Sequence, residues 1–152
     1  MTLVTSAVGW THPDAETLRT QMTAELGPRY ASLRHSRPAR IDVDPATVLV
    51  TLVVHDGALP VATASLRHVG GAHEVKRVFV GQDYRRRGLA GQLLGALEDH
   101  ARELGVRRLV LQTGVRQPEA VELYERLGWQ PVEPFGEYTG DQYSLCYAKE
   151  IS

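Results

Sequence analysis

Residues 75–94, VKRVFVGQDYRRRGLAGQLL, contain the change of pattern that decides the fold. The first six are mostly β-branched or aromatic, which is typical of a strand. From Leu89 onward the apolar residues recur at helical spacing, and Gly105 is placed to end the helix. The apolar stripe comprises Leu89, Leu93, Leu94, Leu97, Ala101 and Leu104. The stretch therefore predicts a strand, an arginine-rich turn and the amino terminus of a long amphipathic helix.

The turn itself, from Arg85 to Ala90, predicts an anion site. A strand followed by a small-residue turn and a helix start points several free backbone N–H groups and the positive end of a helix dipole at one place. Gly88 and Ala90 let phosphate oxygens approach the backbone, and Arg85, Arg86 and Arg87 supply positive charge. A charge run is also typical of a solvated turn. Its position at a helix start favours phosphate binding.

Upstream of this stretch, two turn signals divide an apolar region into strands. Asp56-Gly57 and Gly70-Gly71 separate three runs, TVLVTLVVHD (47–56), LPVATASLRHV (59–69) and HEVKRVFV (73–80). Short turns of this kind join neighbouring antiparallel strands. We expect three antiparallel strands in succession before the arginine-rich turn.

The remaining elements complete one domain over residues 1–152, because no linker or repeat divides the chain. Near the amino terminus we expect a strand over 3–10, a helix capped by Thr11 and ended by Gly27-Pro28, and a short helix over about 28–35. Further on we expect a strand over 107–113, a helix from Gln117-Pro118 to Gly128, and strands over 129–132 and 142–149. Helices interleaved with strands after a run of hairpins indicate a mixed sheet of the α/β (α+β) class.

Composition excludes several classes of protein. The formal charge of −1, from 17 basic and 18 acidic residues, argues against nucleic acid as the main partner. The longest apolar run, 48–54, is far shorter than the ~20 residues of a membrane-spanning helix. A single cysteine, Cys146, forms no intrachain disulfide, which favours a reducing, cytoplasmic setting. The six histidines show no metal-ligand spacing, so we expect no metal.

Two motifs resemble the signatures of the GNAT acyltransferase superfamily. The first is Arg or Gln, two residues, Gly, one residue, Gly or Ala, which Arg85, Gly88 and Ala90 match; the second is EAVELYERLGW over 119–129. The stretch 67–72 also matches the first signature, but it joins two strands and no helix follows, so we interpret it as a hairpin turn. The resemblance extends from about residue 48 to 147.

The resemblance implies the fold and the cofactor. Members have a mixed sheet, here of about six to seven strands flanked by about four helices, with splayed fourth and fifth strands. They use acetyl-CoA, whose pyrophosphate would bind at 85–90, including Leu89, and whose pantetheine arm would pair with the backbone of Val78, Phe79 and Val80. Gln117 matches a position where many relatives have an Asn that contacts the cofactor. The alternative for the strand residues is ordinary core.

The resemblance also implies catalytic residues for acetyl transfer to a primary amine. Glu74 matches the general base of histone-acetylating members, and strand alternation predicts that it shares a face with Lys76, Val78 and Val80. A solvent-exposed Glu74 paired with Lys76 or Arg77 is the alternative. Tyr124 matches the general acid that protonates the departing thiolate. By helical spacing alone it would be a core tyrosine.

The acceptor stays undetermined because the charges around the expected site conflict. Arg29, Arg34, Arg37 and Arg40 would favour an anionic amine, whereas Glu137 and Asp141 would favour a cationic one. We expect a monomer or homodimer without nucleic-acid or membrane partners. The alternative to an enzyme is a non-catalytic acyl-CoA-binding sensor or interaction module, and a nucleic-acid-binding module built on 85–87 is the least favoured.

Overall fold

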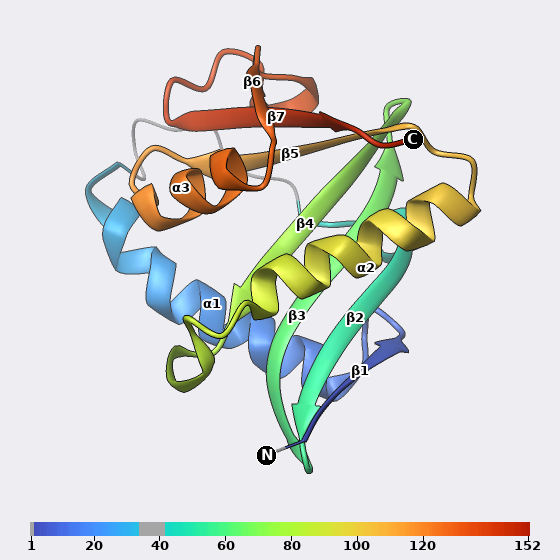
Figure 1. The fold of residues 1–152 in the computed structure, drawn as a ribbon. Helices are drawn as coiled ribbons and strands as arrows, with labels where there is room; N and C mark the ends of the chain where they lie inside the picture. The colour runs from blue at the N-terminus through green and yellow to red at the C-terminus, as the bar shows by residue number, and fades with distance from the viewer. Residues whose placement is uncertain (1, 34–41) are drawn as a thin grey trace.

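The computed structural model describes residues 2–33 and 42–152, and its centre is one mixed β-sheet (Figure 1). Within those residues the sheet has seven strands in the order β1-β2-β3-β4-β5-β7-β6. The strands are β1 (Leu3–Val8), β2 (Val48–Asp56), β3 (Leu59–Val69), β4 (Ala72–Val80), β5 (Arg108–Gly114), β6 (Gln130–Val132) and β7 (Ser144–Glu150). The helices are α1 (Pro13–Tyr30), α2 (Leu89–Glu103) and α3 (Pro118–Arg126). The predicted α/β class with a mixed sheet is confirmed.

The predicted run of antiparallel strands is also confirmed. Strands β2, β3 and β4 pair antiparallel in succession, and β1 adds to the free edge of β2. Gly70 and Gly71 join β3 to β4 with φ angles of 58° and 77°, a conformation that costs glycine little. The second match to the arginine-glycine signature is therefore a hairpin turn, as its sequence context indicates.

Strands β4 and β5 are splayed, as the family resemblance implies. They pair in parallel only at Glu74 with Val110 and Val75 with Leu111, although β4 continues to Val80 and β5 to Gly114. Figure 1 shows the two strands diverging toward their carboxyl ends. The second half of β4 thus has no strand beside it on the β5 side among the described residues.

A bulge in β4 overturns one prediction about this strand. Phe79 pairs with Thr63 and Lys76 with Ser65, so β4 has one residue more than β3 between the two pairs. Arg77, inside this interval, has a left-handed φ of 57°. The extra residue reverses the alternation: Val78 and Val80 pack on the core cluster of α2, whereas Phe79 packs with α1. Glu74 and Lys76 therefore do not share a face with Val78 and Val80.

Helices cover both faces of the sheet. Helices α2 and α3 pack on one face and α1 on the other (Figure 1). The predicted stripe of α2 is buried from Leu89 to Ala101, but Leu104 is 60% exposed. Leu104 lies at the C-cap, just before Gly105 turns the chain with φ 78°, where helical spacing no longer sets the direction of the side chain.

The first helix differs from its predicted form. His12, not Thr11, caps α1, because its ring accepts a hydrogen bond from the backbone N–H of Asp14 at 3.1 Å. The helix continues through Gly27 and Pro28 to Tyr30, and a short 3-10 turn follows over 31–33. The separate helix predicted over 28–35 thus merges with α1, while its last two residues lie outside the described part of the chain. Three α-helices, rather than four, flank the sheet within the described residues.

Candidate active site

The loop between β4 and α2 leaves the amino terminus of α2 uncapped. Gly88 is the N-cap residue with φ 77° and has no side chain that could bond to the helix. The first helical hydrogen bond runs from the N–H of Gln92 to the carbonyl of Gly88 at 3.0 Å, so three backbone N–H groups of the first turn precede it. Such an end is suited to an anion.

The three arginines of this loop have different surroundings, although all are exposed. Arg85 donates from Nε to the Val80 carbonyl at 2.9 Å and pairs through Nη2 with Glu25 of α1 at 2.6 Å. Arg87 donates to the Asp83 carbonyl at 3.2 Å. Arg86 has a φ of 64° and forms no hydrogen bond or ion pair with the described residues. Arg86 is thus the loop cation with the freest charge.

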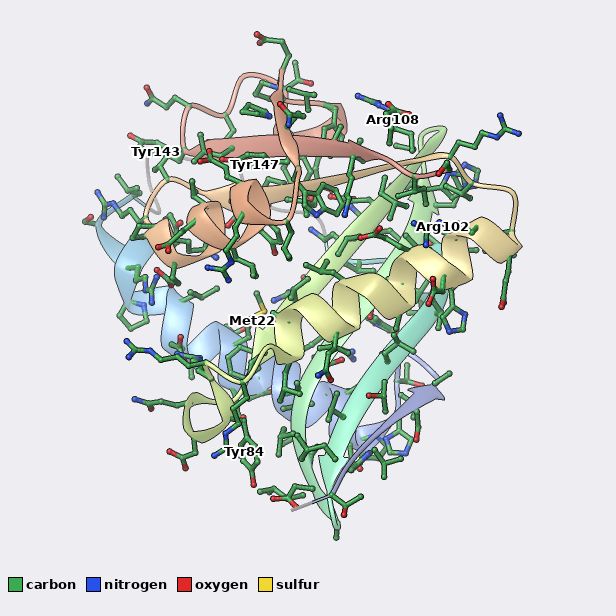
Figure 2. All side chains as sticks on the ribbon, in the orientation of Figure 1. Met22, Tyr84, Arg102, Arg108, Tyr143 and Tyr147 are labelled. Carbon is green, nitrogen blue, oxygen red and sulfur yellow. The ribbon has the colours of Figure 1, made fainter. Side chains whose placement is uncertain are left out.

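Tyr84 anchors the same loop on its other side. Its hydroxyl donates to Asp56 at 2.6 Å, and Figure 2 shows the side chain pointing away from α2 toward the β2–β3 hairpin. The guanidinium of Arg87 lies 5.0 Å from the centre of the Tyr84 ring. These contacts hold the loop in place before any ligand binds.

A cavity of about 350 Å³ lies where β4 and β5 diverge. Helix α1 forms one wall, and β4, β5 and the start of α3 form the others. The side chains that line it include Met22, Leu26, Tyr30, Lys76, Arg77, Gln112, Thr113, Gln117 and Glu137. Met22, labelled in Figure 2, extends from α1 toward β4 and packs against the cluster that contains Phe79. The cavity volume is within the range of small-molecule sites.

A more open depression of about 670 Å³ adjoins this cavity along α1. The two share Thr23, Asp42, Val43 and Arg77. In the depression, Arg19 lies 3.7 Å from the centre of the Trp10 ring and donates to the Trp10 carbonyl at 2.6 Å. Arg77 therefore borders both hollows.

Gln117 connects α1 to the start of α3. It is the N-cap residue of α3, and its Oε1 accepts a hydrogen bond from the Tyr30 hydroxyl at 2.9 Å. Gly114 makes this approach achievable, because a Cβ there would lie 1.9 Å from the Tyr30 oxygen. Arg29 reinforces the junction by pairing with Glu119. These contacts hold the last turn of α1 in helical form despite Pro28.

Glu74 lies inside a network of charged groups and is only 1% exposed. Its Oε1 accepts from Arg67 Nε at 2.8 Å and lies 2.7 Å from Arg67 Nη2, while its Oε2 accepts from the Tyr138 hydroxyl at 2.7 Å. Lys76 donates to the same Tyr138 oxygen at 2.7 Å. The alternative of a solvent-exposed Glu74 is wrong, although Lys76 Nζ does lie 3.9 Å from Glu74 Oε2. Arg67 lies directly opposite Glu74 in the β3–β4 hairpin, so the predicted Gly70-Gly71 turn is a signal that could have found it. Tyr138 is 64 residues from Glu74, and no sequence signal connects the two.

Burial changes the proton affinity of this network. It lowers the pKa of Lys76 because the ammonium loses solvation, although the nearby Glu74 acts in the opposite direction. Burial also raises the pKa of Tyr138, and the negative charge of Glu74 adds to the increase. Lys76 lines the cavity and Glu74 does not, so the carboxylate connects to the cavity through Tyr138 and Lys76.

Tyr124 lies on the other face of the sheet. It is 7% exposed, and its ring meets Trp129 edge-on at 6.1 Å and Tyr147 at 6.2 Å. Figure 2 shows Tyr147 between β7 and α3. Burial raises the pKa of the Tyr124 hydroxyl, and that hydroxyl has no hydrogen-bond partner within residues 2–33 and 42–152. Tyr124 is thus both a core side chain and an uncommitted proton donor.

The residues considered for acceptor binding separate into four groups. Arg29 pairs with Glu119 at the start of α3. Arg34, Arg37 and Arg40 lie outside the described residues. Asp141 is buried and accepts hydrogen bonds from Tyr143 N and Ser144 Oγ, so it shapes a turn. Glu137 does line the cavity, where Arg67 lies 3.3 Å from it.

No helix within residues 2–33 and 42–152 has the length and apolar character needed to cross a bilayer. No cluster of three or more His, Cys, Asp or Glu side chains suited to a metal ion occurs in the same ranges.

Comparisons with known proteins point in one direction. The sequence profile of the acetyltransferase (GNAT) family matches residues 15–129. An "IAA acetyltransferase" from Azospirillum brasilense is 38% identical over 99 residues, which are 65% of this chain and 61% of that protein, so the match spans less than two-thirds of the relative. A putative acyl-CoA N-acyltransferase from Klebsiella pneumoniae has a TM-score of 0.82 at 26% identity, covering 99% of this chain and 98% of that one. The PaiA N-acetyltransferase of Thermoplasma acidophilum, solved in complex with coenzyme A, shares the fold with a TM-score of 0.73 at 13% identity, covering 99% and 100%.

Proposed function

Because the chain belongs to the acetyltransferase (GNAT) family, we propose that it transfers the acetyl group of acetyl-CoA to a primary amine by direct attack on the thioester. The observation that carries this proposal is the splay of β4 from β5, where an unpaired strand edge leads to an uncapped helix terminus and a cavity lies alongside. The Thermoplasma acidophilum protein of the same fold binds coenzyme A in its crystals. Acetyl-CoA is the co-substrate, and the proposal includes no metal.

The phosphates of acetyl-CoA would bind at the start of α2. The backbone N–H groups of Leu89, Ala90 and Gly91 are free of helical partners, and Arg86 is free of ion pairs within the described chain. A pyrophosphate there gains hydrogen bonds from the backbone and charge from the side chain. Arg85 and Arg87 contribute by holding the loop and by their positive field.

The pantetheine arm would extend along β4. The edge that Val78, Phe79 and Val80 present to β5 has no strand beside it in the described structure, so backbone groups there can pair with the cofactor. The Val80 carbonyl already accepts a hydrogen bond from Arg85 Nε at 2.9 Å. At the far end, Gln117 uses its Oε1 for Tyr30, which leaves the amide nitrogen to donate to the cofactor. This arrangement would bring the thioester between Tyr124 and the cavity.

Tyr124 is the general acid in the proposed reaction. As the amine attacks, the carbon–sulfur bond breaks and the thiolate of coenzyme A needs a proton. Its pKa is near that of cysteine, ~8.5, and burial keeps the Tyr124 phenol protonated well above that pH. Its hydroxyl loses no protein hydrogen bond when it turns to the sulfur, because it has none within the described residues.

Glu74 is the base, acting through a chain of hydrogen bonds. Lys76 donates to Tyr138, and Tyr138 donates to Glu74 Oε2. Proton movement along this chain leaves Glu74 protonated and Lys76 neutral, and neutral Lys76 can then take a proton from the acceptor ammonium. The lowered pKa of Lys76 favours this neutral form.

The remaining parts of the proposal concern the molecule as a whole. We infer that residues 1–152 act as one catalytic domain in the cytoplasm, as a monomer or homodimer, without nucleic-acid or membrane partners. The near-neutral charge of −1 supports the exclusion of nucleic acid.

Release of free coenzyme A thiol from acetyl-CoA, followed across amino acids, polyamines, peptides and aminoglycosides, tests the function. We expect turnover with at least one amine, and a loss of ~10²-fold or more in kcat for Tyr124→Phe, the usual contribution of an acid catalyst. Tyr147→Phe is the matched control: its ring belongs to the same cluster, but its hydroxyl is engaged with Glu125 at 3.1 Å, so kcat should stay near that of the wild type.

Tyr138→Phe tests the proton chain without removing the buried ion pair between Arg67 and Glu74, as Glu74→Gln would. We expect kcat/KM to fall at neutral pH and to recover as the pH rises, because more of the acceptor amine then arrives already neutral. A uniform loss at every pH would contradict the chain. Coenzyme A binding without turnover on any amine would favour a non-catalytic acyl-CoA-binding module instead.

A further inference from the structure

Arg77 is a partly buried cation without a counter-charge. It lines the cavity and the adjoining depression, yet its guanidinium forms no hydrogen bond or ion pair with residues 2–33 or 42–152. The stretch 34–41, RHSRPARI, contains no acidic residue that could neutralise it. Arginines withdrawn from solvent usually have such a partner. An anion bound in the cavity would supply the counter-charge that the described chain does not.

The backbone of Arg77 has an unfavourable conformation. A φ of 57° is left-handed, which is unfavourable for any residue with a Cβ, and glycine would be the usual choice at such a bulge. Without the bulge, strand alternation would direct the Arg77 side chain to the face of the sheet that α2 and the apolar core cover. The bulge instead places Arg77 at the cavity and the adjoining depression beside α1. Strain held in this way is typical of functional positions.

A second, independent group in the cavity wall lacks a partner. Thr113 of β5 lines the same cavity and is 5% exposed, and its Oγ1 is buried without a hydrogen bond in the described structure. Buried hydroxyls are nearly always paired. Arg77 and Thr113 come from the two diverging strands, so a ligand between β4 and β5 can reach both.

The formal charges that line the cavity balance, with Lys76 and Arg77 against Asp42 and Glu137, but Arg77 has no partner among them. Lys76 donates to the Tyr138 hydroxyl, through which it passes its proton to Glu74 in the proposed reaction. Glu137 lies 3.3 Å from Arg67, whose guanidinium also pairs with Glu74. Asp42 lies at the rim of the cavity and is exposed to solvent. In the adjoining depression Glu16 is exposed and lies one helical turn from Arg19. No carboxylate within the described chain pairs with Arg77.

We propose that the acceptor is a primary amine that carries a carboxylate, and that Arg77 binds this carboxylate together with the Thr113 hydroxyl. The inference rests on the proposed acetyltransferase function and names its substrate class. The planar guanidinium can donate two parallel N–H groups to a carboxylate, which fixes the orientation of the amine. In the reaction an N–C bond forms and the C–S bond of acetyl-CoA breaks. The ammonium gives one proton to Lys76 before the attack, Tyr124 protonates the sulfur, and the second proton that the nitrogen loses on forming the amide restores the Tyr124 phenol. The carboxylate is unchanged.

Acceptors that differ by one group test this inference. One series shares the phenylalanine side chain: phenylalanine carries a carboxylate, phenethylamine carries no anion, and the aminophosphonate analogue carries a phosphonate. Leucine, isoamylamine and the phosphonate analogue of leucine form a second series with the same three differences. We expect kcat/KM with the carboxylate to exceed that of the plain amine by ~10-fold or more in at least one series, since a site built for a polar group discriminates against its absence. A phosphonate preferred over the carboxylate would overturn the assignment.

Variants identify the residue responsible. Arg77→Gln should lower kcat/KM for the carboxylate acceptor by ~10-fold or more and leave the plain amine nearly unchanged, whereas Arg126→Gln, on the exposed side of α3, should change neither. Arg77→Gly adds a structural control: it relieves the left-handed backbone and so should raise the melting temperature, yet lose the same preference. An equal loss for all acceptors would contradict carboxylate binding.

The two proposals fail in distinguishable ways. Turnover on amines with no carboxylate preference in either series leaves the acetyltransferase function standing and overturns the inference. Absence of thiol release with every acceptor overturns the function and the inference with it.

Discussion

Arg85, Arg86 and Arg87 have identical side chains and adjoin one another, yet each has a different task. Arg85 ties the end of β4 to α1, Arg87 closes the loop on itself, and Arg86 is left uncommitted by its left-handed backbone. The sequence places all three arginines beside a helix start, but it does not show which contacts each one makes. The partner of Arg85, Glu25, lies 60 residues away along the chain. The environment of a charged side chain is a tertiary property.

Lys76 provides a prediction at the residue scale. Because burial lowers its pKa in the folded protein, the unfolded chain binds more protons in the window below the ordinary lysine value of ~10.4. The contribution of Lys76 to the free energy of unfolding therefore increases with pH in that window. We expect the free energy of unfolding of the wild type, relative to Lys76→Gln, to increase from pH 7 to 9.5 in urea titrations. This range stays below the titration of unfolded tyrosine.

The reference for this measurement is Lys149, the other lysine of the chain, whose pair with Glu98 lies at 3.1 Å and far from the cavity. Measured in the same way, Lys149→Gln shows how much pH dependence a lysine-to-glutamine change away from the cavity produces. A constant difference for Lys76→Gln across the range would show that burial of this ammonium does not alter its proton affinity.

At the scale of elements, most of the secondary structure could be predicted because it depends on local patterns. Turn glycines mark the β2–β3–β4 hairpins, and the leucine stripe marks α2. Two predictions failed where tertiary contacts outweigh local preference. Helix α1 continues through Pro28 because Arg29 and Tyr30 are anchored on α3, and β4 contains a bulge that no residue type in KRVFV marks.

The start of α2 allows a paired test of the phosphate site. Gly88→Ala puts a Cβ on a residue with φ 77°, which costs about 1 kcal/mol of stability, and places it where phosphate oxygens would approach. Calorimetric titration with coenzyme A should show an affinity at least ~10-fold weaker.

Gly95→Ala is the control on the same helix. Gly95 lies inside α2 with no atom within 4 Å of an added Cβ, so alanine should stabilise the protein by about 0.5–1 kcal/mol and leave coenzyme A affinity unchanged. Equal affinities for both variants would argue against a ligand at the start of α2.

At the scale of the molecule, the near-neutral total conceals an uneven distribution of charge. Fifteen of the 17 basic residues are arginines, and three of them adjoin the start of α2. The sheet separates two functions: Tyr124 and the apolar core lie on the side of α2 and α3, while the charged network and the cavity lie on the side of α1. The two sides of the sheet are open to each other where β4 and β5 diverge.

Ligand binding at the splay should be visible in hydrogen exchange of the whole chain. With saturating coenzyme A we expect amides of residues 78–80 and 89–91 to gain protection, because the cofactor would pair with the open edge and the open helix end. Amides of β2, already paired on both edges, should change little. Protection spread evenly over β2 and β4 would indicate global stabilisation without the proposed binding mode.

The sequence by itself determined the hairpins, the start of α2 and most of the order of elements along the chain, because each depends on local spacing. The resemblance of its motifs to a family supplied the candidates Tyr124 and Glu74. Only the tertiary structure decided that Glu74 is enclosed by Arg67 and Tyr138, that Arg77 faces the cavity, and that α1 covers it. The physical reason is that a one-residue bulge reverses the faces of a strand, and burial then decides which charges find partners within the chain.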